Sequence, residues 1–322
     1  MLPTNAFFTQ PNVEFTQEIG ESIISSMNGR SFYPRNLRHF GMPVSIVRQK
    51  PGSPPLFLKH DVVKIDSEYF IITSEIGKGA YGKVYRGFCF RKNEWFAVKV
   101  QSPHDGSSSQ IATQTSLTRK YGLGTSSTVF GPTAFYITIG NRTTLNVYVA
   151  MPLADCSLDK YIRRNFDMTL CEACEIIIQI CQQLICLHEG GYCHMDIKAD
   201  NVLMKDKKVY LSDFGIATPI GTVRPLSPYP SRSYPQCGPE MFIDGAMPGK
   251  RYFRTSPSFD AWGIGLLIKY CNYHVNSPVL DSLSKMYMKP NPEDRPPLQT
   301  LTHILDNIQK QLAGFPDSDE KK

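Results

Sequence analysis

A run of polar residues between two apolar segments holds the densest potential chemistry in the sequence. It contains Asp196, Lys198 two positions later and Asn201 five positions after the aspartate. A second carboxylate, Asp213, opens the next loop after a short hairpin predicted over 202–208. Carboxylate and amide oxygens on two such loops suit Mg²⁺, a hard cation that prefers oxygen ligands. Each piece alone is ordinary turn chemistry, but together and in this order they predict a magnesium site.

Three glycines between two predicted strands indicate a place for phosphate groups. Gly77, Gly79 and Gly82 follow the pattern GxGxxG. Without β-carbons, their backbone amides can approach phosphate oxygens closely. The same pattern opens the helix of dinucleotide-binding domains. Here strands flank it on both sides and no helix follows, which favours a hairpin lid over phosphates.

Lys99 is a second candidate for binding phosphate. It lies 17 positions after Gly82, in the apolar strand sequence Phe96 to Val100. One interpretation is an edge residue whose aliphatic stem covers apolar surface. Its place directly after the glycine-rich hairpin favours the other interpretation, a phosphate ligand.

The elements that must position these residues form a strand-rich part followed by a helix-rich part. Apolar patterns bounded by turn residues predict strands over 69–77, 83–90, 94–100, 133–139 and 144–151. A short helix is predicted near 110–120, and an apolar run from Leu170 to Leu187 predicts a buried helix. This order predicts an α+β fold of two lobes, with the junction near 151–156.

The ends of the chain differ from this central part. Residues 1–65 contain proline-rich stretches such as PGSPP at 51–55, which predict a partly irregular extension. The expected divisions are therefore an extension at 1–65, a domain at 66–312 with lobes at 66–151 and 156–312, and a polar tail at 313–322.

Composition and charge exclude several classes of protein. The net charge is +6, and the basic residues are scattered rather than grouped as in a nucleic-acid-binding block. Nine cysteines show no disulfide-like spacing. Cys171 and Cys174 form a CxxC inside the predicted buried helix, which favours core packing over a zinc site lacking a second ligand pair. Reduced thiols indicate an intracellular compartment.

Targeting signals give little further information. The N-terminus lacks the basic and apolar regions of a secretory signal. The sequence pattern leads us to expect no apolar stretch of the roughly 18 residues that a membrane span needs. We therefore expect a soluble protein without a membrane or nucleic-acid partner, cytoplasmic by default, with the nucleus left open. The oligomeric state is not given by the sequence.

Taken together, these motifs resemble those of eukaryotic-type serine/threonine protein kinases, over about residues 69–310. The resemblance implies a bilobal protein-kinase fold that transfers the γ-phosphoryl group of ATP to serine or threonine hydroxyls of protein substrates. It implies that Asp196 is the catalytic base or orients the substrate hydroxyl, and that Lys198 steadies the transferred phosphoryl group. Asn201 and Asp213 are then the ligands of Mg²⁺, and Lys99 holds the α- and β-phosphates.

The resemblance also assigns residues around the nucleotide. Met151 falls at the gatekeeper position, and Pro152 to Ala154 form the hinge that binds adenine through its backbone. The residues expected to contact ATP are Ile76, Gly77, Gly79, Gly82, Val84, Ala97, Lys99, Met151, Leu153 and Ala154.

Other matches imply structural and specificity roles. Gly238-Pro239-Glu240 stands where the family usually has Ala-Pro-Glu, and Glu240 is expected to pair with Arg295. Asp260 is expected near the start of the central buried helix of the large lobe. Serine/threonine specificity rests on Lys198 and on Ser233, whose hydroxyl is expected to hold the catalytic aspartate and lysine.

Met195 is one departure from the family pattern, because it replaces an arginine that normally pairs with a phosphate on the activation segment. We therefore expect activity without phosphorylation of that segment. Four hydroxyl-bearing residues are nevertheless available there: Thr218, Thr222, Ser227 and Ser231.

A second departure concerns the partner of Lys99. The helix expected to supply a glutamate, within 107–122, contains no acidic residue. Gln110 or Gln114 can offer an amide oxygen; otherwise an acid comes from elsewhere or the pair is dispensable. A pseudokinase-type nucleotide-binding scaffold is therefore the alternative interpretation, opposed by the presence of every catalytic residue named above. A small-molecule kinase of the aminoglycoside or choline type fits poorly, because those enzymes lack the Gly-Pro-Glu segment.

A third departure is the compressed large lobe. Only 35 positions separate Asp260 from Arg295, which leaves room for one helix where the family has an additional one. The preceding gap is long and contains Lys250, Arg251 and Arg254, either as a solvated loop or as a contact for acidic substrates. In these departures the chain resembles divergent kinases of large DNA viruses or intracellular pathogens.

Overall fold

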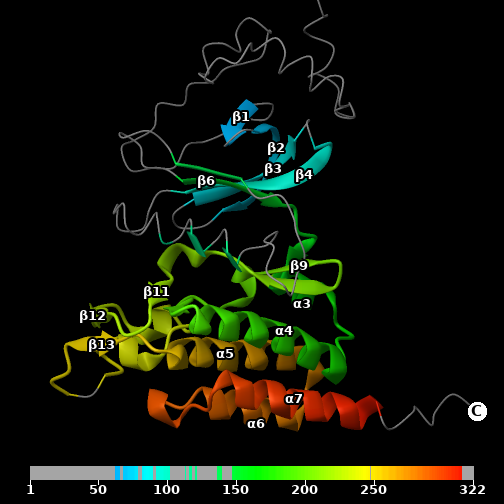
Figure 1. Cartoon of the computed structure of the whole chain (residues 1–322). Helices are drawn as coiled ribbons and strands as arrows, with labels where there is room; N and C mark the ends of the chain where they lie inside the picture. Colours follow the sequence, from blue (N-terminus) through cyan, green and yellow to red (C-terminus); the bar gives the residue numbers. More distant parts are fainter. Residues whose placement is uncertain are drawn as a thin grey trace, which may run out of the picture. The chain divides into compact units, whose positions relative to one another are not determined.

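The computed structural model describes two compact units, divided between Leu153 and Ala154, with 121–123 assigned to the second unit (Figure 1). The described residues are 62–65, 68–78, 82–89, 92–101, 113, 116, 117, 120, 121, 136–139, 147–246 and 248–313. Nearly all of the predicted N-terminal extension and of the C-terminal tail lies outside these ranges. Of the predicted helix near 110–120, the described residues Thr113, Ser116, Leu117 and Lys120 are helical.

The first unit contains a six-stranded antiparallel sheet in the order β1-β2-β3-β4-β6-β5. Its strands are β1 Val62–Ile65, β2 Glu68–Lys78, β3 Gly82–Cys89, β4 Glu94–Gln101, β5 Tyr136–Ile139 and β6 Val147–Pro152. The strand β1 pairs with β2 along its whole length. The sheet therefore begins before residue 66, within the range predicted as a partly irregular extension. A four-residue strand beside a proline-rich stretch is recognised only through its pairing.

The two faces of this sheet have different compositions because side chains alternate along a strand. One face is a core of large buried side chains, made of Val63, Ile65, Phe70, Ile72, Tyr85, Cys89, Phe96, Val98, Val100 and Ala150. On the opposite face, Lys99 of β4 pairs with Val84 of β3 and Val149 of β6. The sheet thus separates an apolar face from one that carries a half-buried lysine.

The second unit is mostly helical. The helices α4 and α5 lie side by side, with α7 packed on α4 and α6 on α5 (Figure 1). The helix bounds are α3 Leu158–Arg164, α4 Leu170–Glu189, α5 Pro257–Val275, α6 Pro278–Tyr287 and α7 Leu298–Ala313. The short strands are β7 Cys156–Ser157, β8 Tyr192–Cys193, β9 Val202–Lys205, β10 Lys208–Leu211, β11 Thr218–Pro219, β12 Val223–Pro225 and β13 Tyr252–Arg254.

The helix α4 forms the centre of this unit. The hydroxyl of Thr169 caps it by accepting from the amide of Glu172 at 3.2 Å. By length and composition the helix could cross a membrane, so the expectation that no stretch is long enough is wrong. More than half of it is buried against other elements, as in the core helix of a soluble protein. Cys174 and Cys181 are buried there, as predicted, but Cys171 is exposed, so the predicted core packing of the CxxC is wrong for its first cysteine.

Two glutamines of α4 fix the hairpin β9–β10 by bonding to its edge strand. Gln183 donates to the carbonyl of Val209 and accepts from the amide of Leu211, both at 2.9 Å. The side chain of Gln179 accepts from the amide of Val209 at 3.1 Å. These bonds satisfy backbone groups that the edge of a sheet would leave unpaired. The segments that enter and leave the hairpin at its open end, which carry Asn201 and Asp213, are thereby held on the helix.

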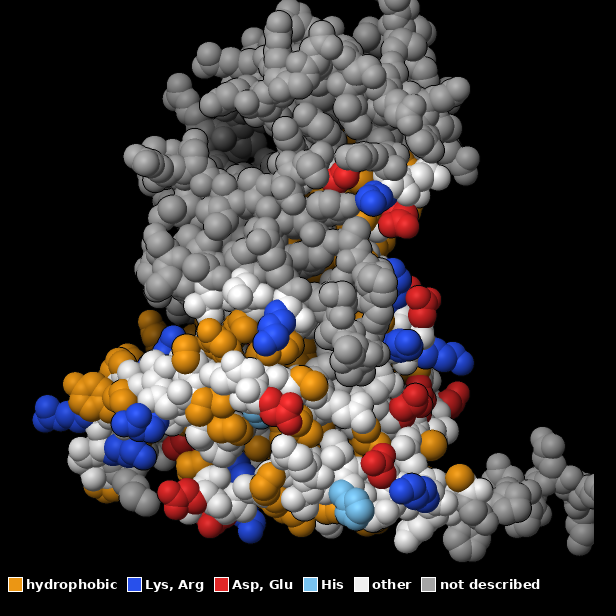
Figure 2. Space-filling model, viewed as in Figure 1, with side chains coloured by type: hydrophobic (Ala, Val, Ile, Leu, Met, Phe, Trp, Pro, Cys, Tyr) orange, Lys and Arg blue, Asp and Glu red, His pale blue; other side chains and the backbone are white. Residues whose placement is uncertain are grey.

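The region after the hairpin accounts for two unusual spacings in the sequence: the short separation of Asp260 and Arg295, and the long gap that precedes Asp260. Between α5 and Arg295, one α-helix, α6, is found, followed by a single turn at Pro292–Asp294, as the sequence predicts. The long gap before α5 contains β13, which pairs with β12. Figure 2 shows Lys and Arg side chains gathered among hydrophobic ones in the area of these two strands.

Candidate active site

The carboxylate of Asp196 is held by three side chains. Its Oδ2 accepts from Nζ of Lys198 at 2.7 Å and from Nδ2 of Asn201 at 2.8 Å. Its Oδ1 accepts from Nε2 of Gln236 at 2.9 Å. Asn201 also donates to the backbone carbonyl of Asp196 at 2.9 Å. The predicted catalytic residues of this loop are therefore brought together around one carboxylate, which is 16% exposed.

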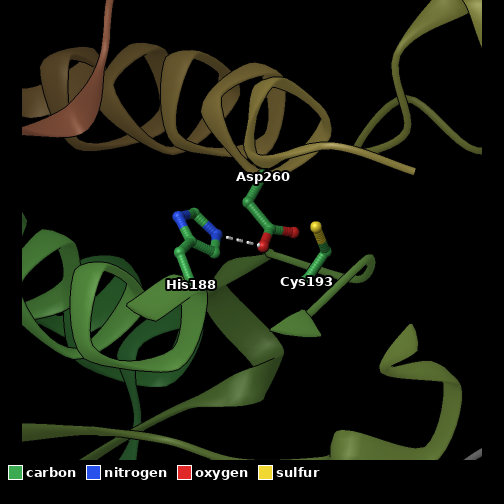
Figure 3. A group of neighbouring side chains, drawn as sticks. All are labelled: His188, Cys193 and Asp260. Atoms are coloured by element: carbon green, nitrogen blue, oxygen red, sulfur yellow. Dashed lines mark hydrogen bonds and ion pairs between the residues drawn. The ribbon is translucent and has the colours of Figure 1, made fainter. Parts of the chain in front are cut away.

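The loop is anchored to α5 by the buried carboxylate of Asp260. Its two oxygens accept from the amides of His194 and Met195, each at 2.8 Å. Nε2 of His188 on α4 bonds to the same carboxylate at 2.8 Å (Figure 3). Burial alone would raise the pKa of Asp260, but the hydrogen bond and charge of His188 and the amide of His194 hold it below its ordinary value of 3.8. The aspartate therefore fixes the start of the predicted catalytic loop.

His188, Cys193 and Asp260 also have the composition of a metal site. Their ligand atoms lie within 4.8 Å of one another (Figure 3). Both carboxylate oxygens of Asp260 already accept N–H groups, however. Burial and the nearby charge of Asp260 raise the pKa of Cys193, and a protonated thiol is a poor metal ligand. We therefore interpret this group as an anchor of the loop.

Met195, the residue that departs from the family pattern, has a left-handed backbone with φ of 71°. This conformation is uncommon for a residue with a side chain. The side chain packs in a buried apolar cluster whose other members are Cys193, Leu226, Phe253 and Phe259. Leu226 belongs to the segment after Asp213, and Phe253 to β13. Apolar packing thus links the catalytic loop to the activation segment where the family uses an ion pair with phosphate.

The predicted magnesium ligands are linked through Ser212. Its amide and its hydroxyl both donate to the carbonyl of Asn201, each at 2.9 Å. The next residue, Asp213, is half-buried and has a left-handed backbone with φ of 65°. Because Asn201 turns its amide N–H groups towards Asp196, its side-chain carbonyl oxygen is directed elsewhere. An amide oxygen and a carboxylate on two linked loops fit the preference of Mg²⁺ for oxygen ligands.

His194 connects the loop of Asp196 with the loop of Asp213. Its Nε2 donates to the carbonyl of Ser212 at 3.0 Å, and its Nδ1 accepts from the amide of Asp196 at 3.4 Å. Its ring lies 5.2 Å from that of buried Phe214. One fully buried imidazole therefore sets the spacing between the catalytic loop and the loop of Asp213.

The predicted phosphate and nucleotide residues of the first unit share one face of the sheet. Ala97 pairs with Met151, and Lys99 pairs with Val84 and Val149. Because residues two apart on a strand face the same side, Ala97 and Lys99 lie on the face opposite the apolar core. The sheet therefore aligns the apolar and the basic candidates for binding ATP in one row.

The remaining nucleotide candidates are only partly described. Gly77 of β2 pairs with Val84, and Gly82 begins β3, so strands do flank the glycine pattern as predicted. Ile76, Leu153 and Ala154 are half-buried, and the amide of Leu153 donates to the carbonyl of Trp95 at 3.4 Å. Residues Gly79, Gln110 and Gln114 lie outside the described residues.

A cavity of about 690 Å³ adjoins the catalytic loop within the second unit. Its walls come from α3, α5 and residues 197–200, and its lining is mostly apolar. Phe166 and Tyr273, which are strongly exposed, each make an edge-to-face contact with His274, with ring centroids at 5.4 and 5.1 Å. Lys198 lines this cavity and also bonds to Asp196, so the cavity lies beside the predicted catalytic residues.

The activation segment contacts Asp196 through a residue that the sequence did not indicate. Ser233 is exposed, and in the described part of the chain no hydrogen bond of its hydroxyl is found. Gln236, three positions later, donates to Asp196 instead. The expected role of Ser233 is therefore not supported. No periodicity or motif marks Gln236, because its contact depends on how the segment turns after residue 233.

Comparison with known proteins agrees with this geometry. Residues 70–303 match the protein kinase domain. The chain belongs to the protein kinase family. This kinase is 25% identical over 202 residues to cyclin-dependent kinase F-3 of Oryza sativa subsp. japonica, covering 62% of this chain and 43% of that protein. It is 31% identical over 174 residues to MAP3K epsilon protein kinase 1 of Arabidopsis thaliana, covering 49% of this chain and 12% of that protein.

A third relative is a probable serine/threonine-protein kinase of Dictyostelium discoideum, 28% identical over 165 residues, which are 48% of this chain and 32% of that protein. The alignments thus span between about an eighth and less than half of the length of these three relatives. The α+β architecture, with a strand-rich part followed by a helical part, is the predicted bilobal kinase fold.

The kinase's predicted pair of Glu240 and Arg295 is confirmed as a buried, bidentate ion pair. Nη1 and Nη2 of Arg295 donate to Oε1 and Oε2 of Glu240 at 2.6 and 2.7 Å. The other three N–H groups donate to the carbonyls of Lys289, Ser258 and Pro290. All five donors of the guanidinium are therefore used, which offsets the cost of burying the charge.

The pair also explains why this kinase has glycine at position 238. A β-carbon there would lie 2.4 Å from both carboxylate oxygens of Glu240. Such a distance is shorter than any normal contact, and the carboxylate cannot move away without breaking its bonds to Arg295. Gly238 therefore permits the observed geometry of the pair.

Proposed function

We propose that this chain catalyses transfer of the γ-phosphoryl group of ATP to serine or threonine hydroxyls of proteins. The observation that carries the proposal is the arrangement around Asp196. A carboxylate fixed by Lys198, Asn201 and Gln236, next to a loop that presents Asp213, supplies the groups that phosphoryl transfer needs. The similarity to a relative named as a probable serine/threonine-protein kinase supports the choice of acceptor.

Each residue then has a role in positioning and in charge neutralisation. Asp196 accepts the proton of the substrate hydroxyl or orients that hydroxyl for attack. The ammonium of Lys198 lies beside this carboxylate and stabilises negative charge on the transferred group. Asn201 and Asp213 would hold Mg²⁺, which supplies neutralisation of the phosphate charge when bound. Lys99 and the glycine-rich strands hold the remaining phosphates.

We also propose that the enzyme is active without phosphorylation of its activation segment. The cluster around Met195 holds the segment through apolar contacts. Two of the four candidate hydroxyls are poorly suited to carry a phosphate. Thr218 is buried, and the hydroxyl of Ser231 donates to the carboxylate of Asp244, which would repel a phosphate.

The decisive experiment is phosphate transfer from labelled ATP with Mg²⁺ to generic acceptor proteins, with an Asp196→Asn variant beside the wild type. Loss of the general base should lower incorporation by about 100-fold or more. Phosphoamino-acid analysis of the product should give phosphoserine and phosphothreonine. Equal labelling by both proteins would refute the proposal. ATP binding with no transfer by either protein would instead support the nucleotide-binding scaffold.

A further inference from the structure

We propose that Gln236 is a positioning residue for catalysis, fixing the carboxylate of Asp196 from the activation segment. This inference rests on the proposed function and takes it one step further. The carboxamide Nε2 lies 2.9 Å from Oδ1, while the other two donors, Lys198 and Asn201, both bond to Oδ2. Among the described residues, Gln236 provides the side-chain donor to Oδ1. Without it, one oxygen of the catalytic carboxylate would lose its fixed direction.

The backbone around Gln236 is anchored on both sides. The indole N–H of Trp262 on α5 donates to the carbonyl of Pro235 at 2.9 Å. On the other side, the thiol of Cys237 lies 3.9 Å from the carbonyl of Met195, the residue before Asp196. These two contacts attach the segment to the central helix and to the catalytic loop. The carboxamide is therefore held at the carboxylate by a fixed backbone.

The thiol of Cys237 strengthens this anchor because it keeps its proton. Burial and, next, the charge of Asp196 raise the pKa of Cys237 to about 12. At neutral pH the group is a weak donor and introduces no second negative charge beside the catalytic carboxylate. The carboxamide of Gln236 at Asp196 and the thiol of Cys237 at the carbonyl of Met195 are thus both uncharged.

The geometry leaves room for the substrate hydroxyl. An ionised carboxylate offers about four lone-pair directions. Lys198, Asn201 and Gln236 use three, and the hydroxyl can donate to the fourth, on Oδ1. The opposite interpretation is that Gln236 occupies the place of the hydroxyl and blocks the site. The two interpretations predict opposite effects of shortening the side chain, so one set of variants separates them.

The test compares the wild-type chain with Gln236→Ala, Gln236→Glu and, as the matched control, Gln182→Ala at an exposed position of α4. Steady-state kinetics with Mg·ATP and an acceptor protein should show a kcat about 10- to 100-fold lower for Gln236→Ala, because the base loses its orientation. The KM for ATP should stay within about twofold, since the contact is made with the base only. Gln182→Ala should keep the wild-type kcat, because that side chain is exposed on α4 and belongs to none of the predicted site residues.

Gln236→Glu distinguishes positioning from mere filling of space. Glutamate has nearly the same shape as glutamine but presents an acceptor, without a proton, to the carboxylate of Asp196. The proposal requires a loss of kcat at least as large as that of Gln236→Ala. Thermal unfolding of each variant, with a Tm within about 2 °C of the wild type, shows that the fold is retained.

The possible outcomes separate this inference from the proposed function. An inactive wild type, equal to Asp196→Asn, would overturn both. An active wild type with unchanged kcat in Gln236→Ala, or with full activity in Gln236→Glu, would overturn the role of Gln236 alone. A higher kcat in Gln236→Ala would show that the side chain blocks the site, and would also overturn positioning.

Discussion

At the scale of single residues, a substitution at Gly238 tests how rigidly the ion pair of Glu240 and Arg295 is held. We expect Gly238→Ala to lower the free energy of unfolding by about 1–3 kcal/mol, because the new methyl group would overlap the carboxylate oxygens. Urea unfolding followed by circular dichroism measures this change. The family's usual alanine at this position makes the prediction specific to the side-chain geometry of this chain.

A double-mutant cycle gives the control for that prediction. In a Glu240→Ala background the overlapping carboxylate is gone, so Gly238→Ala should cost no more than a few tenths of a kcal/mol. Glu240→Ala itself should cost about 3–5 kcal/mol, since it leaves the buried guanidinium of Arg295 without its partner. If Gly238→Ala lowers the free energy of unfolding by the same amount in both backgrounds, the carboxylate of Glu240 is not what the methyl group overlaps.

The same residues show what the sequence could and could not predict at this scale. The pair of Glu240 and Arg295 follows from family motifs, because both partners lie in recognisable segments. The contact of Gln236 with Asp196 spans 40 positions and depends on a turn that no motif specifies. The apolar packing of Met195 could not be predicted either, because its neighbours come from segments up to about 60 positions away. Sequence reasoning recognised the missing arginine but could not see what replaces it.

At the scale of elements, α5 is the support on which the catalytic loop is built. Asp260 in its first turn receives two loop amides and His188. Three residues later, a β-carbon at Gly263 would lie 2.7 Å from Cβ of Ile197, in the loop between Asp196 and Lys198. The loop therefore lies directly on the helix backbone, and small changes in the first two turns of α5 should be transmitted to the predicted catalytic residues.

We expect Asp260 to make the stability of the second unit depend on pH in the acid range. Asp260→Asn replaces one acceptor oxygen by an NH₂ group facing a backbone N–H, and we expect a loss of about 3 kcal/mol at neutral pH. Because the folded-state pKa of Asp260 lies below its ordinary value of 3.8, its contribution is present above that value. It is lost as the pH falls through the lower folded-state pKa.

Urea unfolding of wild type and Asp260→Asn at a series of pH values measures this dependence. The difference in stability between them should be constant from about pH 5 to 7 and narrow below about pH 4. His188→Asn, which leaves both backbone bonds to Asp260 in place, should show a smaller loss. A difference between wild type and Asp260→Asn that does not change down to about pH 2 would contradict the assignment.

Elements with strong local patterns were predictable, and those that exist through distant pairing were not. The strands β2, β3 and β4 and the helix α4 agree with their predicted ranges to within two residues. β1 is too short to show an alternating pattern, and β12–β13 joins two three-residue strands about 30 positions apart. In both cases hydrogen bonds to a partner strand define the element, and sequence periodicity does not.

At the scale of the whole molecule, the candidate residues divide between two units. Lys99 and the glycine-rich strands belong to the first, and Asp196, Asn201 and Asp213 belong to the second. Our proposal that the chain is active without phosphorylation requires that other contacts hold the activation segment of the second unit in place. The cluster of Met195 with Leu226, Phe253 and Phe259 gives a physical basis for this, because burial of apolar surface holds the segment without a covalent switch.

The last prediction is that complete dephosphorylation leaves the enzyme active. After treatment with a broad-specificity phosphatase, confirmed by mass spectrometry and followed by removal of the phosphatase, kcat should stay within about twofold of the untreated value. A kinase known to require activation-segment phosphate, treated in parallel, should lose its activity. Met195→Ala should instead destabilise the cluster by about 2–5 kcal/mol and lower kcat, with or without phosphatase. Collapse of wild-type activity on dephosphorylation would show that a phosphate, and not the apolar cluster, holds the segment.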